Sequence, residues 1–323
     1  MKKFCLGIVG SGYIARFHMD AFSAIGHKPQ ILISSDDSLT AHEFAEEYSI
    51  KKVVRCSDFF NDKKSTDLDG LIIACNTEHT SKYIKWSQQN KIWTLAEKPI
   101  SYDLETIRSF LEFKLCIAGF NRRYYPNIKH LRSQMHLNTS KKLFIDMNLP
   151  ERTNETKLFG ASFNKVFSNC VHGIDLLHYI CGELNIDNIQ KILGNGSRIV
   201  NASNQRFEVR VNFLINSPTN FSIKVYGLNE FYDLTPFELL TIYNKLEIKY
   251  PTKEHPVARY LPKVNKVISA ISDEKPDIKP GFLEQAKAFI QCVKEGRKNQ
   301  DLPDLSDALH AQSFIQTVFK DLI

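Results

Sequence analysis

The chain has 323 residues, of which 43% are hydrophobic and 24% are charged, the ordinary balance of a soluble globular protein. The net charge of +6 comes from basic residues spread along the chain and not from a run of like charges, so the composition does not indicate nucleic-acid binding. No stretch approaches the ~18 apolar residues of a membrane-spanning helix. We therefore expect a cytoplasmic protein with no membrane partner.

The first third of the chain alternates short apolar runs with helical patterns. The expected strands are 4–9, 30–34, 70–75, 92–96 and 115–118. Between them, apolar residues recur at helical spacing over 14–25, 41–48 and 104–111. Continuous apolar runs are typical of strands that are buried on both faces. The alternation therefore predicts an α/β domain with a doubly wound parallel sheet over residues 1–120.

After Gly119 the expected strands become longer and partly alternate polar with apolar residues. They lie at 142–148, 206–216, 220–226 and 238–249, a pattern that favours a mostly antiparallel sheet with one open face. Helices are expected near 171–181, 281–296 and 304–322. The stretch 251–280 holds five prolines, so we expect a long loop there with at most a short helix. We therefore expect residues 121–323 to form a second, α+β domain, whose closing helices can pack back on the first domain.

A glycine-rich motif follows the first expected strand. Gly10-Ser11-Gly12-Tyr13-Ile14-Ala15 fits G-x-G-x-x-G/A and opens an amphipathic helical pattern. In this context the glycines allow a tight turn and let the backbone approach a pyrophosphate at a helix N-terminus. The alternative interpretation is a plain glycine turn. The motif favours a bound dinucleotide.

Two acids, Asp36 and Asp37, follow the second expected strand. An acid about 20 residues beyond the glycines commonly binds the adenosine ribose hydroxyls, and Asp36 is the better placed. No Arg or Lys occurs between residues 29 and 50 to hold a 2′-phosphate, so the sequence favours NAD over NADP. The alternative is that both acids simply begin the next helix, where negative charge suits the helix dipole.

Two further segments carry candidate catalytic groups. Lys98, in Glu97-Lys98-Pro99, leaves the strand expected at 92–96, and an ammonium group beside a nicotinamide can stabilise developing negative charge. Many lysines at strand ends are only surface residues. His172 and Asp175 share a helix face, and imidazole is the natural base near neutral pH. A histidine on an apolar helix is more often a core residue.

The histidines and cysteines show no zinc-like spacing, so we expect no metal site.

Together these motifs resemble the glucose–fructose oxidoreductase / inositol dehydrogenase / MocA (Gfo/Idh/MocA) family. The matching segments are residues 10–15, 96–100, 118–126, 172–175, 282–285 and 304–309, so the resemblance spans nearly the whole chain. It implies a Rossmann domain, a C-terminal domain whose open sheet makes a homo-oligomer (a dimer or a tetramer), and hydride transfer between NAD(P) and a secondary alcohol of a sugar derivative.

The resemblance also implies roles for individual residues. Lys98 and His172 would be catalytic. Cofactor contacts would come from Gly10, Gly12, Tyr13, Ile14, Asp36, Cys75, Asn76, Glu97 and Lys98, and substrate contacts from Asn121, Arg122, Ser168, His172 and Asp175.

Two positions depart from the family pattern. Ser168 stands where the family often has an aspartate, four residues before the catalytic histidine, and Asn76 stands where a proline is usual. The missing carboxylate at Ser168 would lessen repulsion toward an anionic substrate, and Arg122 and Arg123 lie nearby in the domain-junction motif. We therefore expect a sugar acid or a nucleotide sugar, as in surface-polysaccharide assembly.

Two rival functions stay open at the level of sequence. One is a catalytically silent dinucleotide-binding regulator, against which the presence of both Lys98 and His172 speaks. The other is a reductase of a non-sugar carbonyl or imine. A test for NAD reduction with a panel of sugars separates the first rival from an enzyme.

Overall fold

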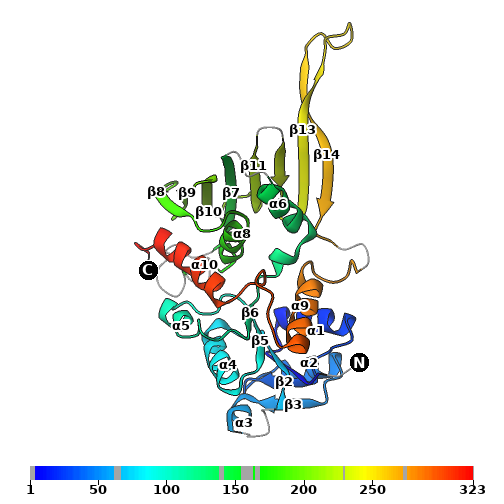
Figure 1. Ribbon diagram of the computed structural model, residues 1–323, viewed down its shortest axis with the longest axis vertical. Coiled ribbons are helices and arrows are strands. Elements are labelled where there is room, and N and C mark those ends of the chain that lie inside the picture. The colour runs from blue at the N-terminus through cyan, green and yellow to red at the C-terminus, as the bar shows by residue number, and fades with distance from the viewer. Residues whose placement is uncertain are drawn as a thin grey trace. The chain divides into compact units, whose positions relative to one another are not determined.

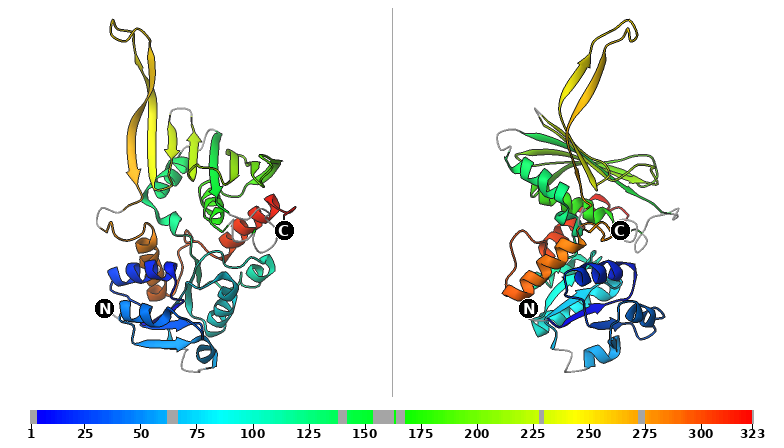
Figure 2. Two further views of the ribbon diagram at one scale, coloured as in Figure 1. Left: turned by 180° about the vertical axis from the view of Figure 1, so that it is seen from behind. Right: turned by 90° about the vertical axis from the view of Figure 1, so that its right-hand side faces the viewer.

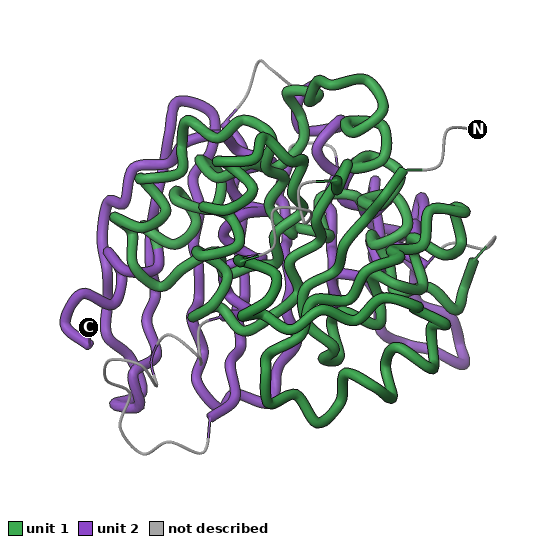
Figure 3. Tube along the Cα trace, turned by 90° about the horizontal axis from the view of Figure 1, so that it is seen from below, with its two compact units in different colours: residues 1–124, 273–314 green, residues 125–272, 315–323 purple. Residues whose placement is uncertain are grey.

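The computed structural model describes residues 4–61, 67–137, 142–153, 163, 168–227, 230–271 and 275–322. The chain forms two compact units, coloured separately in Figure 3. Unit 1 comprises residues 1–124 and 273–314, and unit 2 comprises residues 125–272 and 315–323. The sequence predicted that residues 273–314 belong to the second domain and that their closing helices can pack back on the first.

Unit 1 is built on a six-stranded parallel sheet. Its order is β3-β2-β1-β4-β5-β6, and all neighbouring pairs run parallel. The strands are β1 (Leu6–Val9), β2 (Ile31–Ser34), β3 (Lys52–Arg55), β4 (Gly70–Ile73), β5 (Trp93–Ala96) and β6 (Cys116–Ala118). Every residue of β1, β4 and β5 is buried. This order is that of a Rossmann sheet, so the predicted α/β fold is confirmed.

Helices from both ends of the chain belong to unit 1. They are α1 (Tyr13–Ala24), α2 (Ala41–Glu47), α3 (Cys56–Asn61), α4 (Thr77–Asn90), α5 (Leu104–Arg108), the 3₁₀ turn η2 (Asn121–Tyr124), α9 (Phe282–Glu295) and the first part of α10 (Leu305–Val318). Helix α9 packs on α1, as Figures 1 and 2 show. Its Phe282, Ala286 and Phe289 enter the same buried core as β1 and α1.

Unit 2 contains an eight-stranded, mostly antiparallel sheet, as predicted. Its order is β14-β13-β12-β11-β7-β10-β9-β8, and only β7 and β10 pair in parallel. The strands are β7 (Leu143–Glu151), β8 (Asn185–Lys191), β9 (Arg198–Ser203), β10 (Phe207–Ile215), β11 (Ser222–Tyr226), β12 (Phe231–Leu234), β13 (Leu239–Lys249) and β14 (Arg259–Ser269).

Two helices of unit 2, α6 (Pro126–Leu137) and α8 (Cys170–Cys181), pack on one face of this sheet. Strand β7 shows why: Leu143, Ile145 and Met147 are buried, whereas the alternate residues Phe144 and Asp146 are only half-buried. Strand β10 alternates in the same way. We call the face that carries the alternate residues the open face.

The prediction of a loop over 251–280 is wrong for residues 259–269. These residues form β14, which pairs antiparallel with β13. The prolines misled the prediction because Pro251 and Pro256 lie in the connection between the strands and Pro262 lies on an edge strand. An edge strand tolerates a missing N–H that would break a central ladder.

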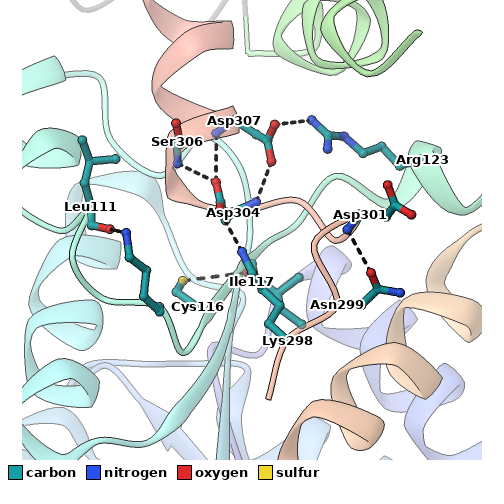
Figure 4. Close-up of polar contacts among 11 residues, drawn as sticks. Leu111, Cys116, Ile117, Arg123, Lys298, Asn299, Asp301, Asp304, Ser306 and Asp307 are labelled. Atoms are coloured by element: carbon teal, nitrogen blue, oxygen red, sulfur yellow. Dashed lines mark hydrogen bonds and ion pairs between the residues drawn. The ribbon is translucent and has the colours of Figure 1, made fainter. Parts of the chain in front are cut away.

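The start of α10 is held by reciprocal hydrogen bonds (Figure 4). The Asp304 carboxylate accepts from the N–H groups of Ser306 (2.8 Å) and Asp307 (3.2 Å), and the Asp307 carboxylate accepts from the Asp304 N–H (2.8 Å). Lys298 Nζ lies 2.8 Å from Asp304 Oδ2, and Arg123 pairs with Asp307 at 2.8 Å. Burial acts to raise the pKa of Asp304, but the Lys298 ammonium and the two N–H donors outweigh it and lower the pKa.

Replacing Asp304 by alanine should lower the free energy of unfolding by about 1 kcal/mol at neutral pH, because the helix loses its N-terminal cap. The pKa of Asp304 is lower in the folded state than in the unfolded chain. Its stabilisation is therefore full above about pH 4 and is lost as the pH falls through the folded value. Urea unfolding of Asp304→Ala at neutral pH and near pH 3 measures both effects, with Ser306→Ala as the control. An equal difference at both pH values would mean that the Asp304 charge is not involved.

Candidate cofactor and substrate site

Three adjacent strands of unit 1 end at the same edge of the sheet, and each is followed by predicted site residues. Gly10 follows β1, Cys75 and Asn76 follow β4, and Glu97 and Lys98 follow β5. The strand order reverses direction between β1 and β4. In open α/β sheets, ligands bind outside the carboxyl ends of the strands at such a reversal. Unit 1 therefore brings these predicted cofactor residues together.

The turn at Gly10 can be made only by glycine. Its φ is +97°, and a Cβ there would lie 2.6 Å from the carbonyl oxygen of Ala74. The Gly10 N–H donates to the carbonyl of Ile33 (2.9 Å). The turn is thus fixed between the ends of β2 and β4, directly at the strand reversal.

The start of α1 fits the phosphate groups of a dinucleotide. Gly12 precedes the helix, no side chain caps it, and its first turn contains no acid. A Cβ added to Gly12 would meet no described atom within 4 Å. The N–H groups of the first turn carry the partial positive charge of the helix. Tyr13 is 71% exposed here, whereas Ile14 packs against the core.

A buried contact that sequence reasoning missed holds the segment of Lys98. His18 of α1 is 1% exposed, and its Nε2 lies 2.8 Å from Glu97 Oε1. The second oxygen of Glu97 accepts from the Lys98 N–H at 3.3 Å. The ring of Phe282 meets His18 edge-on at 4.9 Å between centroids. The one available signal was a histidine on the apolar stripe of the helix that follows the glycine motif.

Asp36 lies at the end of β2 and is exposed. Its carboxylate accepts hydrogen bonds from the N–H (3.1 Å) and the hydroxyl (2.9 Å) of Ser57, and these lower its pKa. Arg55 and Lys82 lower the pKa further. Residues 29–50 hold no Arg or Lys, but β3 pairs with β2 and sets Arg55 opposite Ser34, so cations from outside this range act on Asp36.

Cys75 and Asn76 lie between β4 and α4. Burial raises the pKa of the Cys75 thiol to about 11 against a smaller opposing effect of Thr80, so the thiol is neutral at physiological pH. Asn76 precedes α4 as its N-terminal cap residue, but its side chain makes no capping hydrogen bond. The Asn76 amide therefore has no helix-capping role.

Two predicted substrate residues, Asn121 and Arg122, lie in the 3₁₀ turn η2. Asn121 is 5% exposed, and its amide donates to the carbonyl of Pro280 (3.0 Å), just before α9. This bond gives Asn121 a structural task in unit 1. Arg122 is half-buried. Its neighbour Arg123 is engaged by Asp307, as described above.

The remaining predicted residues belong to α8 of unit 2. His172 (7% exposed) and Asp175 (1% exposed) lie one turn apart, and Ser168 is in the turn before the helix. A Cβ on Gly173 would lie 2.3 Å from Leu149, so the glycine lets α8 approach β7 closely. The buried carboxylate of Glu151 accepts from the N–H of Cys170 (2.9 Å) and so binds the positive end of α8. These contacts hold the helix that carries His172 close to β7.

Among the described residues, no group of three or more His, Cys, Asp or Glu side chains is placed to hold a metal ion. No helix in the described part of the chain is long and apolar enough to cross a membrane.

Known proteins resemble this chain in sequence and in fold. Residues 4–114 match the model of an oxidoreductase family with an NAD-binding Rossmann fold, GFO_IDH_MocA. The uncharacterized oxidoreductase YrbE of Bacillus subtilis is 25% identical over 212 residues, which cover 62% of this chain and 60% of that protein. The match thus spans about three fifths of the curated relative's length.

Two solved structures share the fold over almost their whole length. An oxidoreductase from Agrobacterium radiobacter, in complex with NAD+, L-tartaric acid and magnesium, is 12% identical with a TM-score of 0.72 and covers 99% of this chain and 96% of its own. A myo-inositol dehydrogenase from Corynebacterium glutamicum is 16% identical with a TM-score of 0.68, with the same coverage of 99% and 96%. Together with the glycine turn and the Rossmann strand order, the family match shows that residues 4–114 are similar to the Gfo/Idh/MocA oxidoreductases, a family with an NAD-binding Rossmann fold.

Proposed function

We propose that this protein transfers a hydride between NAD and a secondary alcohol or ketone of a sugar derivative. The observation that carries the proposal is the edge of the unit 1 sheet, where the uncapped turn at Gly12 and the Lys98 segment follow strands of the same three-strand group. The names of the two solved relatives, one a polyol dehydrogenase and one bound to NAD+, support this chemistry.

Each residue has a task in this proposal. The N–H groups at the start of α1 bind the pyrophosphate. Lys98 donates a hydrogen bond to the substrate oxygen and stabilises negative charge on it. An imidazole nitrogen of His172 takes the proton of the hydroxyl during oxidation and returns it during reduction. NAD supplies the hydride acceptor. The buried His18–Glu97 contact holds the backbone that carries Lys98.

We propose an acidic substrate, either a sugar acid or a nucleotide sugar of surface-polysaccharide biosynthesis. Ser168 carries no charge at a position where the family often has a carboxylate. At ~4 Å and an effective dielectric near ~20, two like charges repel by about 4 kcal/mol, so a neutral serine removes a large penalty for an anion. The polyhydroxy acid bound to the Agrobacterium radiobacter relative is of this chemical class.

We further propose that the open face of unit 2 joins two copies of the chain. Four charges lie side by side across neighbouring strands and alternate in sign: Arg210, Asp146, Lys224 and Asp233. None of them is buried. A two-fold axis that reverses this row brings Arg210 against the partner's Asp233 and Asp146 against the partner's Lys224. The row is therefore complementary to itself, as an isologous contact requires.

Beside the charges runs a row of aromatic side chains in direct cross-strand register. Phe144, Tyr226, Phe231 and Tyr243 follow one another across β7, β11, β12 and β13, with ring centroids 5.7, 5.0 and 5.5 Å apart. Tyr226 is 45% exposed. We call these four residues the aromatic row. Rings that stay half in water on a single chain gain stability when a second sheet covers them.

Replacing Lys98 by methionine should lower kcat by about 10²–10³-fold on the true substrate, because one positioned charge stabiliser is lost. The Kd for NAD should change far less, since the pyrophosphate is held at α1. Lys85→Met, an exposed lysine of α4, is the matched control and should behave as the wild type. A Lys98→Met enzyme with normal turnover would remove Lys98 from the mechanism.

Asp36 should make the protein prefer NAD. In the wild type its carboxylate repels a 2′-phosphate, whereas Asp36→Ala leaves Arg55 and Lys82 to attract one. We expect the ratio of the NADP to the NAD dissociation constant to exceed about 10 in the wild type and to fall by at least that factor in Asp36→Ala. Calorimetric titration of both dinucleotides measures the ratio. The same ratio in both proteins would place the adenosine ribose away from Asp36.

The charge row predicts a complementation experiment. Arg210→Asp sets two carboxylates against each other in both contacts of the dimer, and Asp233→Arg sets two cations against each other. Each variant should therefore dimerise at least tenfold more weakly than the wild type. An equal mixture restores opposite charges in both contacts and should form a heterodimer. Sedimentation velocity measures all three samples. Wild-type dimerisation by either single variant would exclude the open face as the interface.

A further inference from the structure

The hairpin β13–β14 extends beyond the sheet that it belongs to (Figures 1 and 2). Strand β12 pairs with β13 only from Leu240 to Tyr243. Beyond that point β13 and β14 pair only with each other, over 245–249 and 259–263, and no other described strand joins them. We call residues 245–263 the arm.

The arm has two faces of opposite character. On one face Leu246 lies opposite Pro262 and Ile248 opposite Tyr260. Strand alternation places Val264 of β14 on the same face. On the other face lie two directly opposite pairs of cations, Lys245 with Lys263 and Lys249 with Arg259, separated by Glu247 and Leu261.

By itself the arm is a weak structure. A two-stranded hairpin with both faces in water is marginally stable at best. Like charges directly across a strand pair destabilise it further, and the basic face has two such pairs. Its apolar face must therefore supply most of the stability, yet Leu246, Ile248 and Tyr260 are 61%, 42% and 64% exposed. The arm has the chemistry of a surface that a partner covers.

The apolar face of the arm continues the aromatic row of the open face. Tyr243 stacks on Phe231 and is paired in register with Val264, which is 49% exposed. From Val264 the surface continues along β14 through Pro262 to Tyr260. A molecule that covers the aromatic row thus meets the apolar face of the arm without crossing a charged boundary.

The size of this face selects the kind of partner. The exposed parts of Leu246, Ile248, Tyr260 and Val264 amount to roughly 400 Å², at ~200 Å² for a fully exposed large side chain. A stable interface buries about 800 Å² on each partner. The arm alone therefore falls short of holding an independent protein. It suffices as an extension of a contact made elsewhere.

We propose that the arm packs its apolar face on the second copy of this chain that the open face holds, and so strengthens that dimer. This inference rests on the proposed open-face dimer and not on the proposed reaction. The basic face points away from the contact, and its charge keeps a third copy from stacking there, so the assembly closes at two. A membrane suits the arm less well, because its cations lie on the face opposite the apolar one instead of flanking it.

The test compares two double variants that differ only in the face they change. Ile248→Thr with Tyr260→Thr removes the apolar face at one cross-strand pair. Lys249→Thr with Arg259→Thr changes the next pair, on the basic face. Threonine keeps the strand preference of the backbone in both. Sedimentation equilibrium of the full chain should show at least a tenfold weaker dimer for the first variant and less than a threefold change for the second. Amide exchange of residues 245–263 should slow with protein concentration in the wild type and in the second variant only.

Equal dimer affinity in the wild type and the apolar-face variant would overturn the proposal, as would equal weakening by both variants. Sedimentation with anionic phosphatidylserine vesicles is the second measurement. Vesicle binding lost in the apolar-face variant while its dimer is unchanged would assign the arm to a membrane instead. A wild type that stays monomeric at tens of micromolar would overturn the arm and the open-face dimer together. An absence of NAD reduction with an intact, arm-dependent dimer would refute the reaction and leave the arm standing.

Discussion

The candidate catalytic lysine depends on a single buried contact between a carboxylate and an imidazole. Glu97 sits where β5 ends, and His18 lies on the helix that begins at the glycine turn. Because both groups are almost excluded from water, neither can lose its partner without a penalty of the order of 1–3 kcal/mol. The contact therefore links the helix that follows the glycine turn to the strand end that carries Lys98. Any shift of α1 would be passed to the backbone of Lys98 through it.

The buried parts of both sheets could be predicted from the sequence because burial leaves a periodic pattern. Strands β1, β4 and β5 are apolar throughout, and β10 alternates strictly. Strand β3 left no such pattern, since it lies at the edge of its sheet and is mostly exposed. The same reason explains the missed β14, whose residues are almost all exposed.

The candidate site was predictable where one short segment makes it and not where distant segments meet. The glycine turn needs only residues 10–15 and a neighbouring strand, so its motif was sufficient. The partner of Glu97 is 79 residues away, and the cations near Asp36 come from β3 and α4. No local sequence pattern indicates these contacts between distant residues, because they follow from the order of the strands and not from spacing along the chain.

The packing of α9 has a consequence for how this protein is made. Phe282, Ala286 and Phe289 complete the core around β1 and α1, and Phe289 lies so close to Gly70 that a Cβ there would come within 2.9 Å of its ring. These core residues are synthesised more than 250 residues after β1. Part of the apolar surface of the parallel sheet therefore stays uncovered until α9 has been synthesised. Such a delay leaves apolar surface of the nascent polypeptide exposed and so favours its aggregation.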